Sequence, residues 1–199
     1  MKELKRLWLV WAILALVAVV YLGSIYLQKS PAIAKAGHSG AIIAFGDSYV
    51  SGVGASAKER AYPAMLSQFL GEEVLNFGQP GDTSYELVKR LNRDVLSKNP
   101  AIVIITVGAM DESKGIPNET AASNLSHLVQ NIQRSGAMVV FAAIDSPSGS
   151  WLPKLVSAQN REMGVLQLDN LMEGIASDPS KMFDKEFPND SGYKGIAER

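Results

Sequence analysis

A serine in the stretch FGDSYVSGVG (residues 45–54) has the surroundings of a nucleophile. Ser48 follows a short apolar run, and two glycines come soon after it. A serine at a turn from a strand into a helix can present its hydroxyl to a substrate, while its own N–H points into the same space and can bind an oxyanion. The alternative is that Asp-Ser followed by glycines forms only a turn. The stretch lacks the G-x-S-x-G pattern of the α/β-hydrolase elbow, so by itself it leaves both interpretations open.

A serine hydroxyl is a weak nucleophile unless a neighbouring base takes its proton. The sequence holds two histidines, and neither is an obvious partner for Ser48. His38 lies ten residues before the serine, in a segment that would have to fold over it. His127 falls off the apolar stripe of a predicted helix, and we expect it to be solvent-exposed. Lys185 and Glu186 could serve only if their loop were displaced, because a working base must lie within hydrogen-bond distance of the serine.

The segments that must position these residues alternate between two patterns. Apolar, mostly β-branched runs, typical of buried parallel strands, occupy residues 41–45, 74–77, 101–108, 137–144 and 164–169. Helical spacing of apolar residues occupies residues 62–71, 84–99 and 118–136, the last with Asn118 as the expected N-cap. The alternation predicts a three-layer α/β/α sandwich around a roughly five-stranded parallel sheet. Ser48, Gly81 and residues 108–111 each follow a predicted strand, where open sheets of this kind bind ligands.

Four blocks of the sequence resemble, in order and spacing, the blocks of the GDSL or SGNH hydrolases. They read FGDSYVSGVGA (45–55), NFGQPGDTSYE (76–86), VGAMDES (107–113) and FDKEFPNDSGYKGIAE (183–198). The likeness extends over most of residues 41–198 and is closest to the lysophospholipase/thioesterase branch. It implies a flavodoxin-like sheet and an SGNH hydrolase-type esterase domain over residues 41–199.

The resemblance implies a role for five positions. Ser48 matches the family's nucleophile, and the N–H groups of Ser48 and Gly81 match its oxyanion donors. Asp184 stands at the position of the carboxylate that orients a histidine, but the histidine position itself is occupied by Phe187. Met110 occupies the position of the asparagine that completes the oxyanion hole.

The two departures weaken the expected chemistry. Removing the histidine of such a triad costs on the order of 10⁶ in turnover, and removing one side-chain oxyanion donor costs on the order of 10²–10³. Because Phe187 cannot accept a proton, we expect a serine ester hydrolase of low activity on lysophospholipid, thioester or O-acetyl esters. The alternative is an inactive protein of the same fold that binds acyl chains or glycans, or serves as a scaffold for a partner. An unrelated nucleotide-binding module is disfavoured because no phosphate-binding glycine loop follows the first strand.

Composition limits the cofactors and partners. The 199 residues include no cysteine, which excludes disulfides, thiolate nucleophiles and cysteine-ligated zinc. Residues 31–199 carry 15 basic and 19 acidic side chains, so they lack the basic surface of a nucleic-acid-binding protein. The sequence contains no pattern of metal ligands, and we expect neither a metal nor another cofactor.

The N-terminus is predicted to anchor the chain to a membrane. Residues 7–27 form an uncharged apolar run, long enough to span a bilayer core of about 30 Å, within a predicted anchor at 1–27 that precedes a linker at 28–40. Basic residues precede the run, so we expect a cytoplasmic N-terminus and a domain on the outer or periplasmic side of the cell membrane. The alternative is a signal peptide cleaved near Ala34 or Ala36, which would release a secreted or periplasmic protein.

Overall fold

The computed structural model describes residues 39–144 and 152–199 of the chain. The predicted membrane anchor and nearly all of the predicted linker lie outside these residues, as does His38. None of the described helices has the length and apolar content needed to cross a bilayer.

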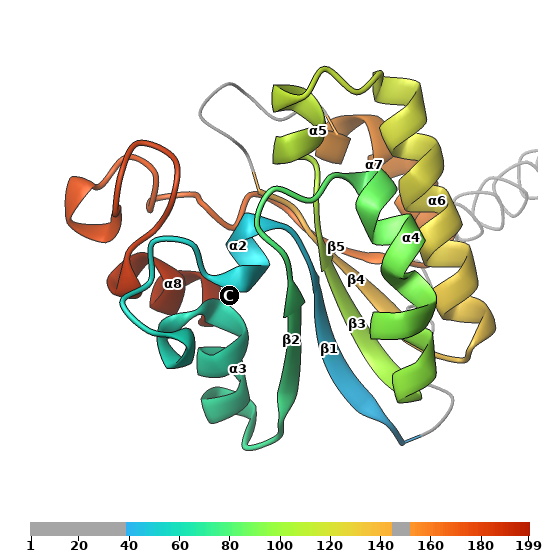
Figure 1. Cartoon of the computed structure of the whole chain (residues 1–199), viewed down its shortest axis with the longest axis horizontal. Coiled ribbons are helices and arrows are strands. Elements are labelled where there is room, and N and C mark those ends of the chain that lie inside the picture. The colour runs from blue at the N-terminus through green and yellow to red at the C-terminus, as the bar shows by residue number, and fades with distance from the viewer. Residues whose placement is uncertain (1–38, 145–151) are drawn as a thin grey trace, which may run out of the picture. The chain divides into compact units, whose positions relative to one another are not determined.

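Five parallel strands form one sheet in the order β2-β1-β3-β4-β5 (Figure 1). The strands are β1 (Ala41–Gly46), β2 (Val74–Gly78), β3 (Pro100–Thr106), β4 (Met138–Ala142) and β5 (Leu166–Leu168). Each coincides with one of the apolar runs, so the predicted five-stranded parallel sheet is confirmed. In the sheet, β2 lies on one side of β1 and β3 lies on the other, so the order of the strands reverses at β1. The carboxyl end of β1 is therefore the switch point at which open α/β sheets bind ligands.

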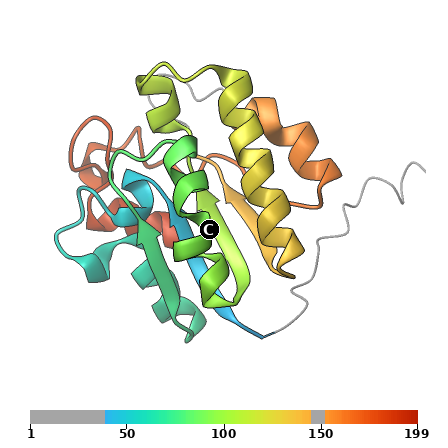
Figure 2. The ribbon, with the colours of Figure 1, turned by 45° about the vertical axis from the view of Figure 1, so that its right-hand side comes forward.

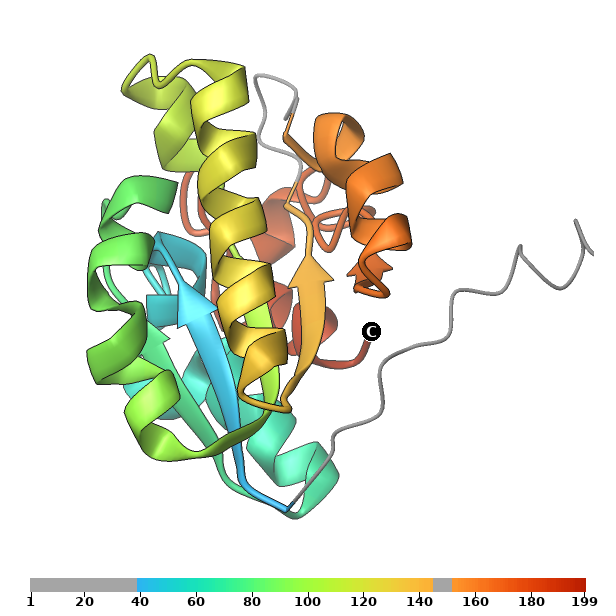
Figure 3. The ribbon, with the colours of Figure 1, turned by 90° about the vertical axis from the view of Figure 1, so that its right-hand side faces the viewer.

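Alternate residues of a strand point to opposite faces of the sheet. Apolar residues point to both faces here, and helices cover both. The helices are α2 (Ser48–Ser51), α3 (Tyr62–Leu70), α4 (Ser84–Asp94), α5 (Ala109–Ser113), α6 (Asn118–Arg134), α7 (Leu152–Glu162) and α8 (Asp190–Ala197), with short 3-10 turns η1 (Lys58–Arg60), η2 (Leu96–Lys98) and η3 (Pro179–Lys181). Ile43 and Phe45 share a core with α4, α6 and α7, which lie side by side in Figure 3. Ala44 shares the other core with α3 and α8, and Figure 2 shows the two layers from an intermediate angle.

The predicted helices are confirmed in outline and differ in detail. The predicted helix over 84–99 ends at Asp94, because Val95 leaves the helical conformation (φ −120°, ψ −66°) and a separate turn follows. Asn118 begins α6, but the prediction that it caps the helix is wrong. Pro117 holds the N-cap position in an extended conformation (φ −56°, ψ 139°), so Asn118 already lies inside the first turn. Helix α7 has no predicted counterpart, since its buried stripe is narrow and includes Asn160.

Candidate active site

Ser48 lies at the switch point, immediately beyond the carboxyl end of β1. It is the first residue of α2, and Asp47 caps this helix by accepting a hydrogen bond from the Tyr49 N–H at 3.0 Å. Gly46 ends the strand where no larger residue fits, since a Cβ there would lie 2.0 Å from the carbonyl oxygen of Thr106. Ser48 itself is only 4% exposed. The strand end and the cap therefore fix the main chain at Ser48.

Asp47 is a buried carboxyl group with a raised pKa. Burial raises the pKa of Asp47 to about 7, the hydrogen bond from the Tyr49 N–H opposes this rise, and the nearby charges of Asp111 and Asp82 add to it. Among the described residues no hydrogen bond joins the Asp47 carboxyl to the Ser48 hydroxyl. Asp47 therefore orders the main chain of α2 and is not placed to take the serine's proton.

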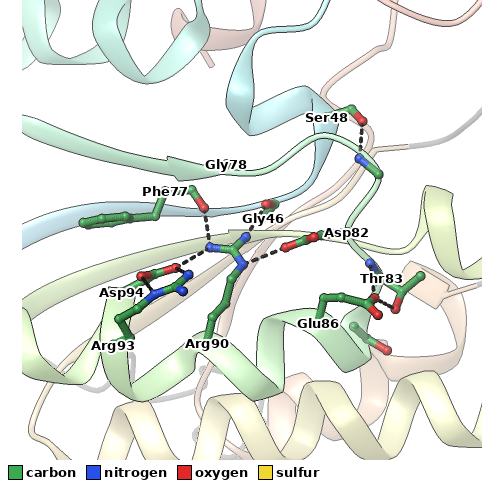
Figure 4. A network of polar contacts seen from close by, with 12 residues as sticks. Gly46, Ser48, Phe77, Gly78, Asp82, Thr83, Glu86, Arg90, Arg93 and Asp94 are labelled. Carbon is green, nitrogen blue, oxygen red and sulfur yellow. Dashed lines mark hydrogen bonds and ion pairs between the residues drawn. The ribbon is translucent and has the colours of Figure 1, made fainter.

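The turn after β2 brings Gly81 to Ser48. The Gly81 N–H donates a hydrogen bond to the Ser48 Oγ at 3.0 Å (Figure 4). Gly81 has a φ of 81°, a conformation that favours glycine, and no atom lies within 4 Å of where its Cβ would be. The Gln79 N–H donates to the Gly46 carbonyl oxygen at 3.0 Å and ties the same turn to the end of β1. The structure thus brings together the two residues that the family resemblance implies as nucleophile and oxyanion donor.

Contacts from α5, from the residue that follows it and from α6 hold this turn and the start of α4. The Asp111 carboxylate accepts hydrogen bonds from the Ser84 N–H at 2.9 Å and from the Ser84 hydroxyl at 2.6 Å. Asn124 donates to that hydroxyl at 2.9 Å, and the Lys114 ammonium donates to the Gly81 carbonyl oxygen at 2.6 Å. Burial raises the pKa of Asp111, and the hydrogen bonds from Ser84 oppose the rise. Asp111 therefore links the third sequence block to the second.

Met110 stands where the family pattern has asparagine, and its surroundings are apolar. It is half-buried and packs against the core shared by α3 and α8. The Ser113 hydroxyl approaches its sulfur at 3.9 Å. Because a thioether has no hydrogen to donate, this position supplies no side-chain donor to an oxyanion.

The loop from Phe183 to Phe187 forms a turn around Asp184. The Asp184 Oδ1 accepts hydrogen bonds from the Glu186 N–H at 2.8 Å and from the Phe187 N–H at 2.7 Å. The Phe183 N–H donates to the Phe187 carbonyl oxygen at 2.9 Å and closes the turn. Asp184 is exposed, and no hydrogen bond among the described residues joins it to Ser48. One carboxylate oxygen of Asp184 is thus used to shape the loop.

Phe187 packs beside the residue that follows Ser48. The centroid of its ring lies 5.3 Å from that of Tyr49, with the ring planes at 53°. The Tyr49 hydroxyl donates to the Glu186 carbonyl oxygen at 3.1 Å and fastens the loop to α2. The position that the family pattern gives to the base therefore lies against Tyr49, the residue after Ser48, and holds an apolar ring.

No substitute base contacts Ser48 in the part of the chain that the structure describes. His127 is exposed on α6, as predicted. Lys185 is exposed and Glu186 is half-buried, and neither makes a hydrogen bond to the Ser48 hydroxyl. Residues 39–144 and 152–199 also contain no group of three or more His, Cys, Asp or Glu side chains that could hold a metal ion. Across these residues the Ser48 hydroxyl has the Gly81 N–H beside it and no proton acceptor.

Arg90 is a candidate that sequence reasoning missed. It lies on α4 with Leu87 and Leu91, which belong to the core, and it is 6% exposed. A charged residue at a buried position of an amphipathic helix is uncommon unless it is paired, and that signal could have identified it.

Comparisons with known proteins agree with this geometry. The model of the GDSL-like Lipase/Acylhydrolase family matches residues 44–194. An arylesterase from Vibrio mimicus is 34% identical over 94 residues, which are 45% of this chain and 47% of that protein. Esterase TesA from Pseudomonas aeruginosa is 27% identical over 130 residues, which are 63% of this chain and 64% of that protein. The chain therefore spans less than two thirds of the length of either curated relative.

Solved structures share the fold over most of the chain. A G-D-S-L family protein from Desulfitobacterium hafniense DCB-2 has a TM-score of 0.73 at 25% identity, covering 80% of this chain and 97% of that one. The crystal structure of TesA has a TM-score of 0.74 at 22% identity, covering 79% of this chain and 94% of that one. Psychrotrophic esterase EstA from Pseudoalteromonas sp. has a TM-score of 0.69 at 21% identity, covering 80% of this chain and 93% of that one. At these identities TesA and EstA support the shared fold alone.

Proposed function

The chain belongs to the GDSL-like lipase/acylhydrolase family, and from this membership we propose that it is a serine esterase of low turnover. Its substrates are acyl esters of the lysophospholipid, thioester or O-acetyl class. The proposal places the domain outside the cytoplasmic membrane, anchored through residues 7–27. The names of the two curated relatives, an arylesterase and an esterase, support ester hydrolysis as the reaction.

One observation carries this proposal, the hydrogen bond of 3.0 Å from the Gly81 N–H to the Ser48 Oγ at the switch point of the sheet. An ester carbonyl bound over this pair is attacked at its carbon by the Ser48 Oγ. The negative charge that develops on the carbonyl oxygen is stabilised by the N–H groups of Ser48 and Gly81. The alcohol or thiol leaves, and water then hydrolyses the acyl-enzyme. Because both donors belong to the main chain, they do not depend on the side chain at Met110.

Proton transfer is the step that this site performs poorly. No side chain of the described residues accepts a hydrogen bond from the Ser48 hydroxyl, and Phe187 cannot act as a base. Sites that keep their oxyanion donors and binding contacts but lose triad members retain catalysis on the order of 10³–10⁴ over water. We therefore propose turnover far below that of a complete Ser-His-Asp site.

A second candidate function is binding of an acyl chain without turnover. It is favoured by one observation: Met110 and Phe187 both pack against the apolar core that contains Tyr49. Two positions that are polar in the family pattern are thus apolar in this chain and pack against one core, which contains the residue after Ser48. This exchange favours a fatty acyl ligand over a glycan, because apolar side chains offer a glycan hydroxyl no hydrogen bond.

Hydrolysis of p-nitrophenyl acetate by the full chain in detergent tests the proposed function. The Ser48→Ala variant serves as the matched control. We expect slow release of nitrophenol that Ser48→Ala abolishes. Equal rates from both proteins would contradict an esterase. Binding of a fluorescent fatty acid by both proteins would then support the second candidate.

A further inference from the structure

Arg90 makes four hydrogen bonds from one buried guanidinium group (Figure 4). Its Nε donates to the Asp82 carboxylate at 2.6 Å, and one terminal nitrogen donates to the Gly46 carbonyl oxygen at 2.8 Å. The other terminal nitrogen donates to the Phe77 carbonyl oxygen at 2.8 Å and to the Asp94 carboxylate at 3.0 Å. A single side chain therefore contacts β1, β2 and the turn that follows β2.

Two of these partners stand next to the candidate site. Gly46 is the last residue of β1, two residues before Ser48, and Asp82 directly follows Gly81. The Ser48 hydroxyl and the Gly81 N–H belong to these two segments and meet at 3.0 Å. The guanidinium of Arg90 thus links the segments on either side of this hydrogen bond.

The surroundings of Arg90 hold its guanidinium in one orientation. The ring of Phe45 lies against it, with the central carbon 4.4 Å from the ring centroid. A guanidinium is planar and presents its donors in a fixed fork, so the carbonyl of Gly46 and the carboxylate of Asp82 cannot move independently once both are bound. A lysine at the same position would carry the charge on one nitrogen and could not reproduce this geometry.

Arg93 provides a natural comparison on the same helix. It donates to both carboxylate oxygens of Asp94, at 2.6 and 2.9 Å, but its side chain is 68% exposed. No hydrogen bond of Arg93 reaches Gly46, Phe77 or Asp82 among the described residues. Arg90 and Arg93 therefore share one partner, while Arg90 alone of the two contacts the segments that carry the site.

We propose that Arg90 is a positioning residue that sets the separation of the Ser48 hydroxyl and the Gly81 N–H by binding Gly46 and Asp82 together. The inference rests on the proposed function, because this separation matters for catalysis only if Gly81 stabilises an oxyanion. Arg90 itself touches no substrate. It acts through the main chain at both of its partners.

The test follows the Gly81 amide directly by NMR. Pro80–Gly81 is the one Pro-Gly pair in the sequence, so labelling glycine with ¹⁵N and proline with ¹³C at the carbonyl selects a single amide signal. This signal is recorded on the full chain and on Ser48→Ala, Arg90→Lys and Arg93→Lys, each with its thermal unfolding midpoint. Hydrolysis of p-nitrophenyl acetate is measured on the same proteins to separate kcat from KM.

We expect Arg90→Lys to move the Gly81 signal in the direction seen in Ser48→Ala, because the hydrogen bond to Ser48 lengthens. We expect kcat to fall about tenfold or more with KM within about twofold, since a misplacement of about 1 Å can cost 10²-fold. Arg93→Lys is expected to leave both the signal and kcat unchanged. An unmoved Gly81 signal in a folded Arg90→Lys protein would overturn the inference.

A replacement variant and a comparison of the two readouts separate failure of the inference from misfolding and from failure of the proposed function. If Arg90→Lys does not fold, Asp82→Asn replaces it, because this change keeps the size of the side chain and weakens the link on the Gly81 side. A Gly81 signal that Asp82→Asn leaves unmoved overturns the inference in the same way. If the full chain shows no turnover that depends on Ser48, the proposed function fails, and the Gly81 signal still decides the role of Arg90.

Discussion

The ring of Phe187 lies against the ring of Tyr49, with centroids 5.3 Å apart, and Tyr49 directly follows Ser48. The loop that carries Phe187 is also fastened here, since the Tyr49 hydroxyl donates to the Glu186 carbonyl oxygen at 3.1 Å. Phe187, in the position that the family pattern gives to the base, therefore contributes packing beside the residue that follows Ser48. Under the proposed function, the side chain of Phe187 both takes the place of the base and helps to hold the loop.

We predict that Phe187→Ala destabilises the protein by about 1–3 kcal/mol, because it removes a half-buried ring and an aromatic pair. Phe183→Ala is the matched control, because Phe183 lies four residues away in the same loop and is 67% exposed, and it should change stability by less than about 0.5 kcal/mol. Urea unfolding of the two variants measures the difference. Equal losses would show that the contact with Tyr49 contributes no stability of its own.

Met110→Asn should restore a side-chain donor to the oxyanion. In a Phe187→His background we predict a gain in kcat of about 10²-fold, in line with the cost of removing such a donor elsewhere. The same change should lower stability, because a polar amide replaces a half-buried thioether in the core of α3 and α8. Met110→Leu, which keeps the packing, should leave kcat unchanged. A gain from Met110→Leu as large as that from Met110→Asn would rule out the oxyanion explanation.

Asp47 should make stability depend on pH. Burial raises its pKa from 3.8 to about 7, so the folded protein keeps a proton that the unfolded chain releases between these values. The stabilisation is fully present below about pH 4 and is lost as the pH rises to about 7, by up to about 4 kcal/mol. Asp47→Asn keeps an acceptor for the Tyr49 N–H and cannot ionise, so it should flatten the curve over this range.

Urea unfolding at pH 5, 6 and 7.5 measures the effect of Asp47. The pKa of Asp111 is also raised by burial, so the total slope contains a second contribution of the same sign. The comparison with Asp47→Asn isolates the part that belongs to Asp47. Parallel curves for the two proteins would contradict the prediction.

Gly54→Ala should displace the loop that carries Phe187. A Cβ at Gly54 would lie 2.4 Å from the Pro188 carbonyl oxygen, at a φ of 93° that disfavours other residues. Gly71→Ala is the control, with a φ of 69° and no atom within 4 Å of its Cβ, so it carries the backbone cost of about 1 kcal/mol without the clash. We expect Gly54→Ala to cost at least about 1 kcal/mol more, as measured by urea unfolding. Equal costs would show that the loop moves aside freely.

The parts of the fold that follow from local pattern were predictable from the sequence. The five strands appear as apolar runs because both faces of the sheet are covered, as Ile43 and Ala44 show by lying in opposite cores. The ends of those runs place Ser48 and Gly81 at one edge, and the structure brings them within 3.0 Å. The pairing itself was implied by the family resemblance, because the strand pattern alone does not give the order of β1 and β2 in the sheet.

Contacts between distant residues were not predictable in the same way. Arg90 stands on the apolar side of its helix with Leu87 and Leu91, which marks it as unusual, but nothing in the sequence specifies its partners, and its bond to Gly46 spans 44 positions. The family resemblance implies that the segment of Phe187 lies near that of Ser48, but the ring contact between Tyr49 and Phe187 does not follow from either segment. Helix α7 was missed because a buried Asn160 interrupts its apolar stripe. The membrane anchor over residues 7–27 remains a prediction outside the described residues.

The central claim is that this chain keeps the nucleophile and the oxyanion donor of its family and lacks the base. Phe187→His tests it, because Asp184 Oδ2 makes no hydrogen bond among the described residues and can orient an imidazole there. Hydrolysis of p-nitrophenyl acetate is compared for the full chain, Phe187→His, and Phe187→His combined with Ser48→Ala. We predict a gain of at least about 10²-fold for Phe187→His, a part of the factor of about 10⁶ that a triad histidine contributes, and its loss with Ser48→Ala. Turnover by the unmodified chain as fast as that of Phe187→His would contradict the account, because it would require a base that already serves Ser48.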